Sequence, residues 1–222
     1  MKQNFILIGS SSELAKEFSK LYEKNYKFIN ITSNSESSSF DNLIVKDYMK
    51  EYEKIINFIK NINNPIIIFF NGFLAENRPI YNPNIEEIQK TFTINYLFPY
   101  LITKKLIENE IQFKKLVFLS SFAASKLRNK NYIYGSCKLL LEKSICNLDF
   151  NNFLFIRFGK INTQFSSSHN KTIFDMKKEK AAKILFEASL NSVGVIYPTI
   201  TIKIISIIIK ILPSKIINFL KI

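Results

Sequence analysis

The sequence predicts an α/β protein with a single doubly wound parallel sheet of about seven strands and helices on both faces. Short apolar, β-branched runs alternate with longer amphipathic stretches along most of the chain. The runs are apolar throughout, as in strands that are covered on both sides. The 222 residues suffice for one domain with its own core. Right-handed crossovers would then give a doubly wound sheet, which binds ligands at the carboxyl ends of its strands.

The alternation locates each element. Strands are expected at Phe5–Ile8, Lys27–Ile31, Asn42–Val45, Pro65–Phe70, Lys115–Ser120, Phe153–Phe158 and Gly194–Tyr197. Helices are expected at Glu13–Tyr22, Glu51–Ile62, Ile85–Asn109, Ile133–Leu148 and Lys177–Leu190. The Ser-rich segment Thr32–Asp41 is expected to be a loop that replaces a crossover helix. We therefore divide the chain into a catalytic-type domain, residues 1–198, and a C-terminal tail, residues 199–222.

Composition excludes several function classes. The net charge is +13, but the lysines are scattered singly, so no nucleic-acid surface is expected. Cys137 and Cys146 lie nine positions apart in one predicted helix, a spacing unsuited to a metal knuckle or an intrahelical disulfide. The single histidine, His169, excludes a multi-histidine metal site and leaves a serine hydrolase without a supported base. Because Phe5–Ile8 is too short for a signal sequence, we expect a reduced, cytoplasmic protein.

A serine-rich turn joins the first strand to the first helix. A bound pyrophosphate requires free backbone N–H groups, a helix N-terminus and little side-chain bulk, all of which this turn offers. Ser10 and Glu13 also have the spacing of a capping box, so the turn could equally be only a well-capped helix start. The residues that would line a phosphate site are Gly9, Ser10, Ser11, Ser12, Glu13 and Leu14.

The end of the second predicted strand bears on the choice of cofactor. Thr32 and Ser33 stand where NAD-preferring sites usually place an acid for the ribose hydroxyls. Because no carboxylate stands there, a 2′-phosphate has room. NADP(H) is therefore favoured over NAD(H).

A tyrosine and a lysine share one face of a predicted helix. Tyr134 and Lys138 are four positions apart, and a nearby ammonium lowers a phenol's pKa by favouring the phenolate. Such a phenol can act as a general acid or base. The pair alone could be a chance feature of a solvated helix face. Ser121, thirteen positions before Tyr134 at the end of a predicted strand, favours the catalytic interpretation.

With these residues in place, the chain resembles the short-chain dehydrogenase/reductase family over about residues 5 to 198. The resemblance implies a Rossmann-type fold. The matching positions, in chain order, are Gly9–Ala15, Asp47, Asn71-Gly72-Phe73, Asn95, Ser121, Tyr134, Lys138 and Arg157–Thr163. With Ser121, Tyr134 and Lys138 counted as one motif, six matches in the family's order and at its separations make the resemblance specific.

The resemblance implies reversible hydride transfer at a carbonyl carbon. Ser121 would bind the carbonyl oxygen, Tyr134 would exchange its proton, and Lys138 would hold the nicotinamide ribose and lower the tyrosine pKa. Asn95 would anchor a relay water. The cofactor-binding positions implied beyond the turn are Ser33, Asp47, Asn71, Gly72, Gly159, Ile161 and Thr163.

Three departures from the family pattern bear on the substrate. Glu13 and Ala15 replace the two later glycines of the turn, which would bring an acidic side chain near the pyrophosphate. Phe158 replaces the usual proline before Gly159. The stretch Gln164–Met176 is short and polar where relatives often carry a helical lid, which suggests an open substrate site or a lost substrate.

The tail has an apolar run of about fourteen residues before Pro213, too short to cross a bilayer of about 30 Å as one helix. Lys203 and Lys210 contribute to a narrow polar stripe. The tail could pack on protein, or it could lie in a membrane interface with its lysines at anionic headgroups. It is similar to the tail of the reductase component of the decaprenylphosphoryl-ribose epimerase, a short-chain reductase that acts on a polyprenyl-linked keto-sugar.

Three functions follow as hypotheses. The first is an NAD(P)H-dependent reductase of a ketone on a sugar or lipid-linked sugar in envelope glycan synthesis. The alternatives are a 3-oxoacyl or small-ketone reductase and a dinucleotide-binding scaffold without turnover. The resemblance further implies a homodimer or homotetramer paired through helices around residues 85–109 and 133–148.

Overall fold

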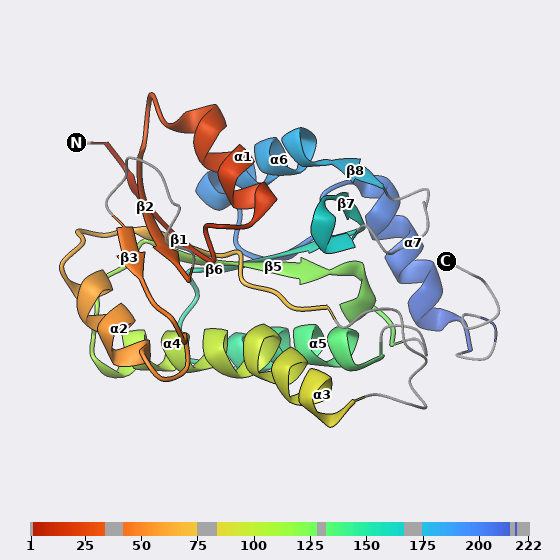
Figure 1. The fold of residues 1–222 in the computed structure, drawn as a ribbon. Coiled ribbons are helices and arrows are strands. Elements are labelled where there is room, and N and C mark those ends of the chain that lie inside the picture. Colours follow the sequence, from red (N-terminus) through yellow and green to blue (C-terminus); the bar gives the residue numbers. More distant parts are fainter. Residues whose placement is uncertain are drawn as a thin grey trace.

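The structure is a computed structural model that describes residues 2–33, 42–74, 84–127, 132–166, 175–213 and 216. Within these residues seven parallel strands form one sheet in the order β3-β2-β1-β4-β5-β6-β9. The chain runs outward from β1 to one edge and then returns to build the other, which confirms the doubly wound sheet (Figure 1). The strands are β1 (Asn4–Ile8), β2 (Lys27–Thr32), β3 (Asn42–Ile44), β4 (Ile66–Phe69), β5 (Lys115–Ser121), β6 (Phe153–Phe158) and β9 (Gly194–Ile196).

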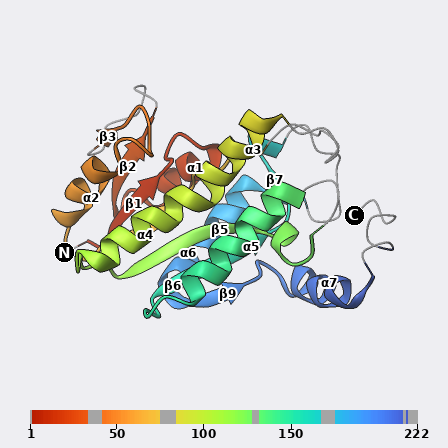
Figure 2. The same ribbon diagram turned by 90° about the horizontal axis from the view of Figure 1, so that it is seen from below.

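Helices cover both faces of this sheet. The helices are α1 (Glu13–Tyr22), α2 (Tyr52–Lys60), α3 (Ile85–Phe92), α4 (Phe98–Glu108), α5 (Tyr132–Cys146), α6 (Lys178–Asn191) and α7 (Ile200–Ile211). In Figure 1, α1 and α6 lie above the sheet, and α2, α4 and α5 lie below it; Figure 2 shows the second layer from below. The upper core contains Phe5, Phe18 and Phe28, and the lower core contains Phe118 and Phe155. Apolar residues on both sides of each central strand explain why the strand sequences do not alternate.

The helix predicted over Ile85–Asn109 is interrupted. Thr93–Leu97 forms a π turn between α3 and α4. Pro99, at the start of α4, has no N–H to donate to the carbonyl of Asn95, so a continuous α-helical ladder cannot pass this point. Interruptions of this kind are frequent at functional sites.

Several short elements follow the sixth strand. β7 (Ile161–Asn162) pairs in parallel with β8 (Met176–Lys177), and a 3₁₀ turn covers Gln164–Ser166. Another 3₁₀ turn, Phe122–Ala124, follows β5. The sequence analysis did not predict these four short elements, because they lie in polar or turn-like stretches without a continuous apolar run. Of the loop predicted over Thr32–Asp41, Thr32 is the last residue of β2, and residues 34–41 lie outside the described residues, as does His169.

The described part of the tail is α7, which packs on Phe122 through Ile202 and Ile209. In the described residues no helix is both long enough and apolar enough to cross a membrane.

Candidate active site

Gly9 brings the first turn of the site against the end of β4. Its φ of +81° lies in the left-handed region, which favours glycine. A Cβ at this position would lie 2.7 Å from the backbone nitrogen of Asn71, closer than real Cβ atoms approach. The turn at the end of β1 therefore requires glycine for conformation and for space.

The helix after this turn is capped by Ser12, not by Ser10. The Ser12 Oγ accepts a hydrogen bond from the Ala15 N–H at 3.2 Å. The predicted capping box from Ser10 to Glu13 is therefore wrong, because Glu13 is already the first helical residue. Ser11 lies exposed beside it, and Leu14 is buried in the core. Because Ser12 caps the helix, the Ser10 hydroxyl does not take part in capping.

Glu13 connects the turn to the segment after β6. One of its carboxylate oxygens accepts a hydrogen bond from the Gln164 N–H at 2.7 Å, and the other lies 3.7 Å from Lys178 Nζ. The acid expected near the pyrophosphate is thus partly neutralised by a lysine and a backbone amide. Both partners lie more than 150 positions further along the chain, so no local pattern could reveal them.

The predicted adenosine end lies beside β2 and β3. Ser33 is exposed directly after β2. Asp47 follows β3, and its Oδ1 accepts hydrogen bonds from the N–H groups of Met49 and Lys50 at 2.9 and 3.1 Å. The Tyr48 hydroxyl donates to the Ile31 carbonyl at 3.2 Å, and burial raises the pKa of Tyr48 to about 12. One carboxylate oxygen of Asp47 therefore already accepts hydrogen bonds from backbone N–H groups of the turn before α2.

Ser121 and Tyr134 meet at the carboxyl end of β5. A hydrogen bond between the side chains of Ser121 and Tyr134 acts to lower the pKa of Tyr134 and partly opposes the effect of burial. The Ser121 Oγ also accepts from the Ala123 N–H at 3.1 Å. A Cβ on Gly135 would lie 2.9 Å from the Ala123 carbonyl oxygen. Gly135, which the sequence analysis did not single out, thus lets α5 approach the turn closely enough to bring Tyr134 to Ser121.

Lys138 lies one helical turn beyond Tyr134. Its Nζ is 5.6 Å from the centre of the tyrosine ring, and the residue is 6% exposed. Burial lowers the pKa of Lys138 from 10.5 to about 8, although Cys137 and Glu142 act in the opposite direction. Tyr134 and Lys138 are therefore adjacent, as predicted from the sequence, but Lys138 is buried and not on a solvated helix face.

The Tyr134 hydroxyl lies deep among protein atoms, although the residue as a whole is only partly buried. This burial raises its pKa well above the ordinary value. The predicted lowering of this pKa by Lys138 is therefore wrong for the protein alone, because desolvation disfavours the charged forms of both side chains. Of the contacts at this phenol, the hydrogen bond with Ser121 acts toward the phenolate.

Asn95 is fully buried in the π turn and links this turn to the segment after β4. Its Nδ2 donates to the Phe73 carbonyl at 2.7 Å and to the Thr91 carbonyl at 2.9 Å, and its Oδ1 accepts from the Phe73 N–H at 3.3 Å. The amide is thus committed to backbone groups. Pro99, four positions further on, cannot donate the α-helical hydrogen bond to the Asn95 carbonyl.

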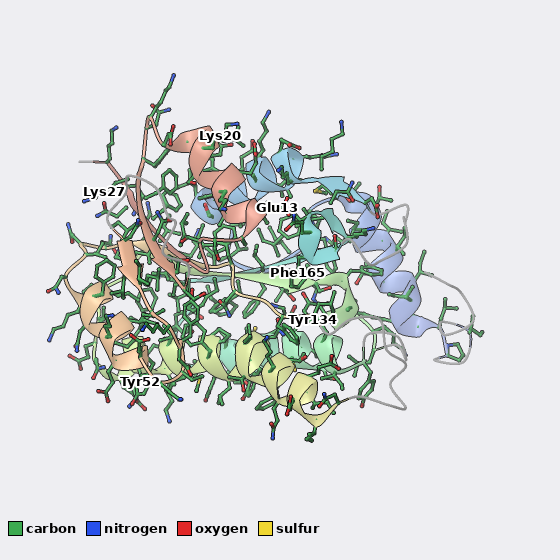
Figure 3. All side chains as sticks on the ribbon, viewed as in Figure 1. Glu13, Lys20, Lys27, Tyr52, Tyr134 and Phe165 are labelled. Atoms are coloured by element: carbon green, nitrogen blue, oxygen red, sulfur yellow. The ribbon has the colours of Figure 1, made fainter. Side chains whose placement is uncertain are left out.

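Phe165 lies over the same region from the segment after β6. Its ring centre is 6.5 Å from that of Tyr134, and a Cβ on Gly72 would lie 3.5 Å from its ring. Glu13, Phe165 and Tyr134 follow one another from top to bottom in Figure 3. Phe165 is nevertheless 47% exposed, so one side of its ring is open. Phe165 is not predictable from a local sequence pattern, because its neighbours Tyr134 and Gly72 come from other parts of the chain.

The predicted nicotinamide segment follows β6 in the chain and leads to Phe165. Gly159 and Ile161 are partly buried, and the Thr163 Oγ1 donates to the Ile161 carbonyl at 3.4 Å. A Lys160–Asp175 ion pair of 3.7 Å ties the segment to the start of α6. Ion pairing and the β7–β8 pairing thus hold together both ends of a segment whose middle, residues 167–174, lies outside the described residues.

A buried ion pair lies behind Lys138. Arg157 on β6 binds the Glu142 carboxylate with Nε at 2.9 Å and also through Nη2. Glu142 lies one turn beyond Lys138 on α5, and it accepts a hydrogen bond from the hydroxyl of Ser120, the neighbour of Ser121. The pair joins β5, α5 and β6 beneath the site. Its two members are fifteen positions apart in different elements, so spacing did not reveal it.

Two buried polar atoms at the carboxyl ends of β1 and β4 have no hydrogen-bond partner among the described residues. They are the Ser10 Oγ and the Asn71 Oδ1. The Asn71 Nδ2 donates to the Ile94 carbonyl at 2.7 Å, whereas its amide oxygen has no partner among the described residues. Buried polar atoms ordinarily have partners. Together with the Gly9 turn, the unpartnered Ser10 hydroxyl and Asn71 amide oxygen fit the binding of a dinucleotide. In the described part of the chain, no cluster of three or more His, Cys, Asp or Glu residues suits a metal ion.

Comparisons with known proteins give a likeness in structure only. No model of a known protein family matches the chain, and no curated protein matches it in sequence. A short-chain dehydrogenase from Burkholderia cenocepacia in complex with NADP superimposes with a TM-score of 0.76 at 11% identity, covering 96% of this chain and 98% of that one.

Two further structures agree with this likeness. A short-chain dehydrogenase from Shigella flexneri complexed with NADP has a TM-score of 0.74 at 14% identity, covering 88% of this chain and 96% of that one. A short-chain dehydrogenase/reductase of the glucose/ribitol dehydrogenase type from Brucella melitensis has a TM-score of 0.70 at 14% identity, covering 89% and 97%. This chain therefore has the fold of the short-chain dehydrogenases/reductases.

Proposed function

We propose that the protein is an NAD(P)(H)-dependent oxidoreductase that reduces a ketone, or oxidises the corresponding alcohol, in the cytoplasm. The observation that carries the proposal is the meeting of Ser121, Tyr134 and Lys138 at the carboxyl ends of the strands, beside the unpartnered Ser10 and Asn71 atoms. Solved structures of the same fold hold NADP, as described above. Both cysteines are free, which suits a reducing compartment.

The residues proposed to hold the dinucleotide follow from their places around the strand ends. The turn Gly9–Ser12 would receive the pyrophosphate, because it offers a helix N-terminus and small side chains. Ser33, where no carboxylate opposes a 2′-phosphate, supports NADP(H) over NAD(H). Asp47, Asn71 and Gly72 are proposed contacts of the adenosine and ribose parts, and Gly159, Ile161 and Thr163 of the nicotinamide part. The bound cofactor would supply the hydride.

Side chains of the protein would transfer the proton to and from the substrate oxygen. The Ser121 hydroxyl would donate to the substrate oxygen, and the Tyr134 hydroxyl would give that oxygen its proton or take it back. Because burial raises the Tyr134 pKa, the phenol is protonated at neutral pH and suited to donate. Lys138, close to its own pKa near neutrality, would supply positive charge as the phenolate forms. A water on the Asn95 carbonyl would carry the proton onward.

The substrate proposed is a keto-sugar, free or lipid-linked, of the kind used in envelope glycan synthesis. The half-exposed ring of Phe165 beside Tyr134 supports it, since such a ring offers an apolar surface next to polar groups. The resemblance of the tail to a reductase of polyprenyl-linked keto-sugars is a further motive for testing that class. A 3-oxoacyl thioester or a small ketone is the alternative substrate.

The oligomer proposed is a homodimer or homotetramer that pairs through the long helices. Phe92, Leu97 and Leu140 are exposed on α3, the π turn and α5. Light scattering of the wild type and of Leu140→Gln would test this face, and a monomeric wild type would contradict it.

The experiment that tests the function is a fluorescence titration with NADPH and NADH, followed by a turnover assay against keto-sugars, 3-oxoacyl thioesters and small ketones. Three proteins are compared: the wild type, Tyr134→Phe, and the matched control Tyr132→Phe, which alters an exposed tyrosine in the same helical turn. General acid catalysis contributes about 10²–10⁴-fold to a rate, so we expect Tyr134→Phe to lose turnover by that factor while still binding NADPH. Tyr132→Phe should behave as the wild type.

Each other outcome has a definite meaning. Failure of both nucleotides to bind the folded wild type would overturn the proposal. Tight binding without turnover of any substrate class would favour a dinucleotide-binding scaffold. Equal loss of turnover in both tyrosine variants would remove Tyr134 from its proposed role.

A further inference from the structure

Helix α7 packs on the protein through one side and leaves a row of isoleucines exposed on the other. The inward side contains Ile202, Ser206 and Ile209, which are buried. The Ser206 Oγ lies 2.8 Å from both the Ser125 Oγ and the Tyr197 hydroxyl oxygen, so the three hydroxyl groups form one hydrogen-bonded cluster. The Arg157 guanidinium binds the same two side chains. The orientation of α7 is therefore determined by specific polar contacts as well as by apolar packing.

The outward side of α7 is a stripe of isoleucines. Ile211 and Ile200 are 81% and 67% exposed. The residues of this isoleucine stripe are Ile200, Ile204, Ile207, Ile208 and Ile211. At 3.6 residues per turn they share one side of the helix, opposite Ser206. Single exposed apolar residues are ordinary on protein surfaces, but a contiguous apolar stripe marks a surface that another molecule covers.

Charge distinguishes between the molecules that could cover it. Lys203 and Lys210 are exposed along one border of the stripe. No Asp or Glu occurs in the sequence after Glu187, whereas residues 199–222 include four lysines. Two copies of this face would bring lysines toward lysines without a carboxylate on α7 or β9 to pair with them. An anionic lipid surface supplies apolar chains for the isoleucines and phosphates for the lysines.

We propose that α7 is a membrane-surface helix that binds anionic lipid, with the isoleucine stripe in the headgroup–acyl boundary and Lys203 and Lys210 at the lipid phosphates. The inference goes beyond the proposed function and does not depend on it. Helix α7 packs on Phe122, the residue after Ser121, at the carboxyl ends of the strands (Figure 1). Membrane binding through α7 would therefore bring the candidate active site close to the lipid surface.

The test is co-sedimentation of the full-length protein with vesicles of phosphatidylcholine alone and of phosphatidylcholine mixed with phosphatidylglycerol. The apolar variant carries Ile204→Gln, Ile208→Gln and Ile211→Gln, and the charge variant carries Lys203→Gln and Lys210→Gln. The control for net charge carries Lys16→Gln and Lys20→Gln on α1, which lies apart from α7 (Figure 3 labels Lys20). Circular dichroism and thermal melting establish that every variant is folded.

We expect the wild type to bind the anionic vesicles, and to bind less in high salt. Each lysine at an anionic surface contributes about a fivefold change in partitioning, so the charge variant should bind about 30-fold more weakly. The apolar variant should not sediment measurably, and the α1 control should bind nearly as the wild type does.

Three results would overturn the proposal. The first is a folded wild type that does not sediment with anionic vesicles. The second is equal weakening by the α7 charge variant and the α1 control, which would indicate net charge alone. The third is a wild-type oligomer that becomes monomeric in the apolar variant without vesicle binding by either protein, which would make the stripe an interface between copies of this chain.

Discussion

Replacing Lys138 by methionine should stabilise the protein at neutral pH while it removes a residue of the candidate active site. Lys138 is 6% exposed, and burial lowers its pKa from 10.5 to about 8. At pH 7.5 the unfolded chain keeps this lysine protonated, so folding must hold a proton on a group whose affinity for it has fallen. Methionine has a similar length and no charge to desolvate.

The magnitude follows from the difference between the two pKa values. At 1.36 kcal/mol per pKa unit, the charged lysine lowers the free energy of unfolding by about 3 kcal/mol at pH 7.5. Between about pH 8 and 10.5 the unfolded state binds more protons than the folded state, so this penalty falls as the pH rises. At pH 9.5 about half of it remains.

The assay is urea unfolding of the wild type and of Lys138→Met at pH 7.5 and pH 9.5. We expect the variant to be more stable by about 3 kcal/mol at the lower pH and by about half as much at the higher pH. Lys143→Met, which removes an exposed lysine from the same helix, is the control for the loss of one lysine charge from α5. A Lys138→Met difference that is constant across this range, or that grows with pH, would refute the reasoning.

Three further substitutions test the packing of the site. Gly135→Ala places a Cβ 2.9 Å from the Ala123 carbonyl oxygen, so α5 must shift; we expect a loss of about 1–3 kcal/mol in urea unfolding and at least tenfold lower turnover. Gly9→Ala meets the Asn71 backbone at 2.7 Å with φ at +81°, and should lower stability by about 1–2 kcal/mol and weaken NADPH binding, measured by fluorescence titration. Glu142→Gln leaves a buried arginine without its carboxylate, and should lower the free energy of unfolding by about 3–5 kcal/mol; an unchanged urea midpoint would contradict the buried ion pair.

The fold and the first outline of the site were predictable because both depend on local patterns. Each strand is a continuous apolar run, since helices cover both of its faces, and the strand bounds differ from prediction by no more than one residue at each end. Tyr134 and Lys138 are adjacent because residues four positions apart share a helical face. The prediction of a capping box at Ser10 was wrong because the turn contains three serines that could cap the helix. The helix begins at Glu13, so Ser12 is the residue in the N-cap position.

What the sequence determined alone is thus the sheet, the glycine turn and the spacing of the tyrosine and the lysine. Tertiary structure decided the environment of these groups. Burial raises the Tyr134 pKa, whereas the sequence analysis expected it to be lowered. Glu13 binds Gln164 and Lys178, which lie more than 150 positions further along the chain. The outward direction of the α7 isoleucines likewise depends on Ser206 bonding to residues of other elements. Burial of an ionisable group, and its hydrogen bonds and ion pairs, depend on residues that are distant along the chain. The periodicity of the sequence gives no information about these long-range contacts.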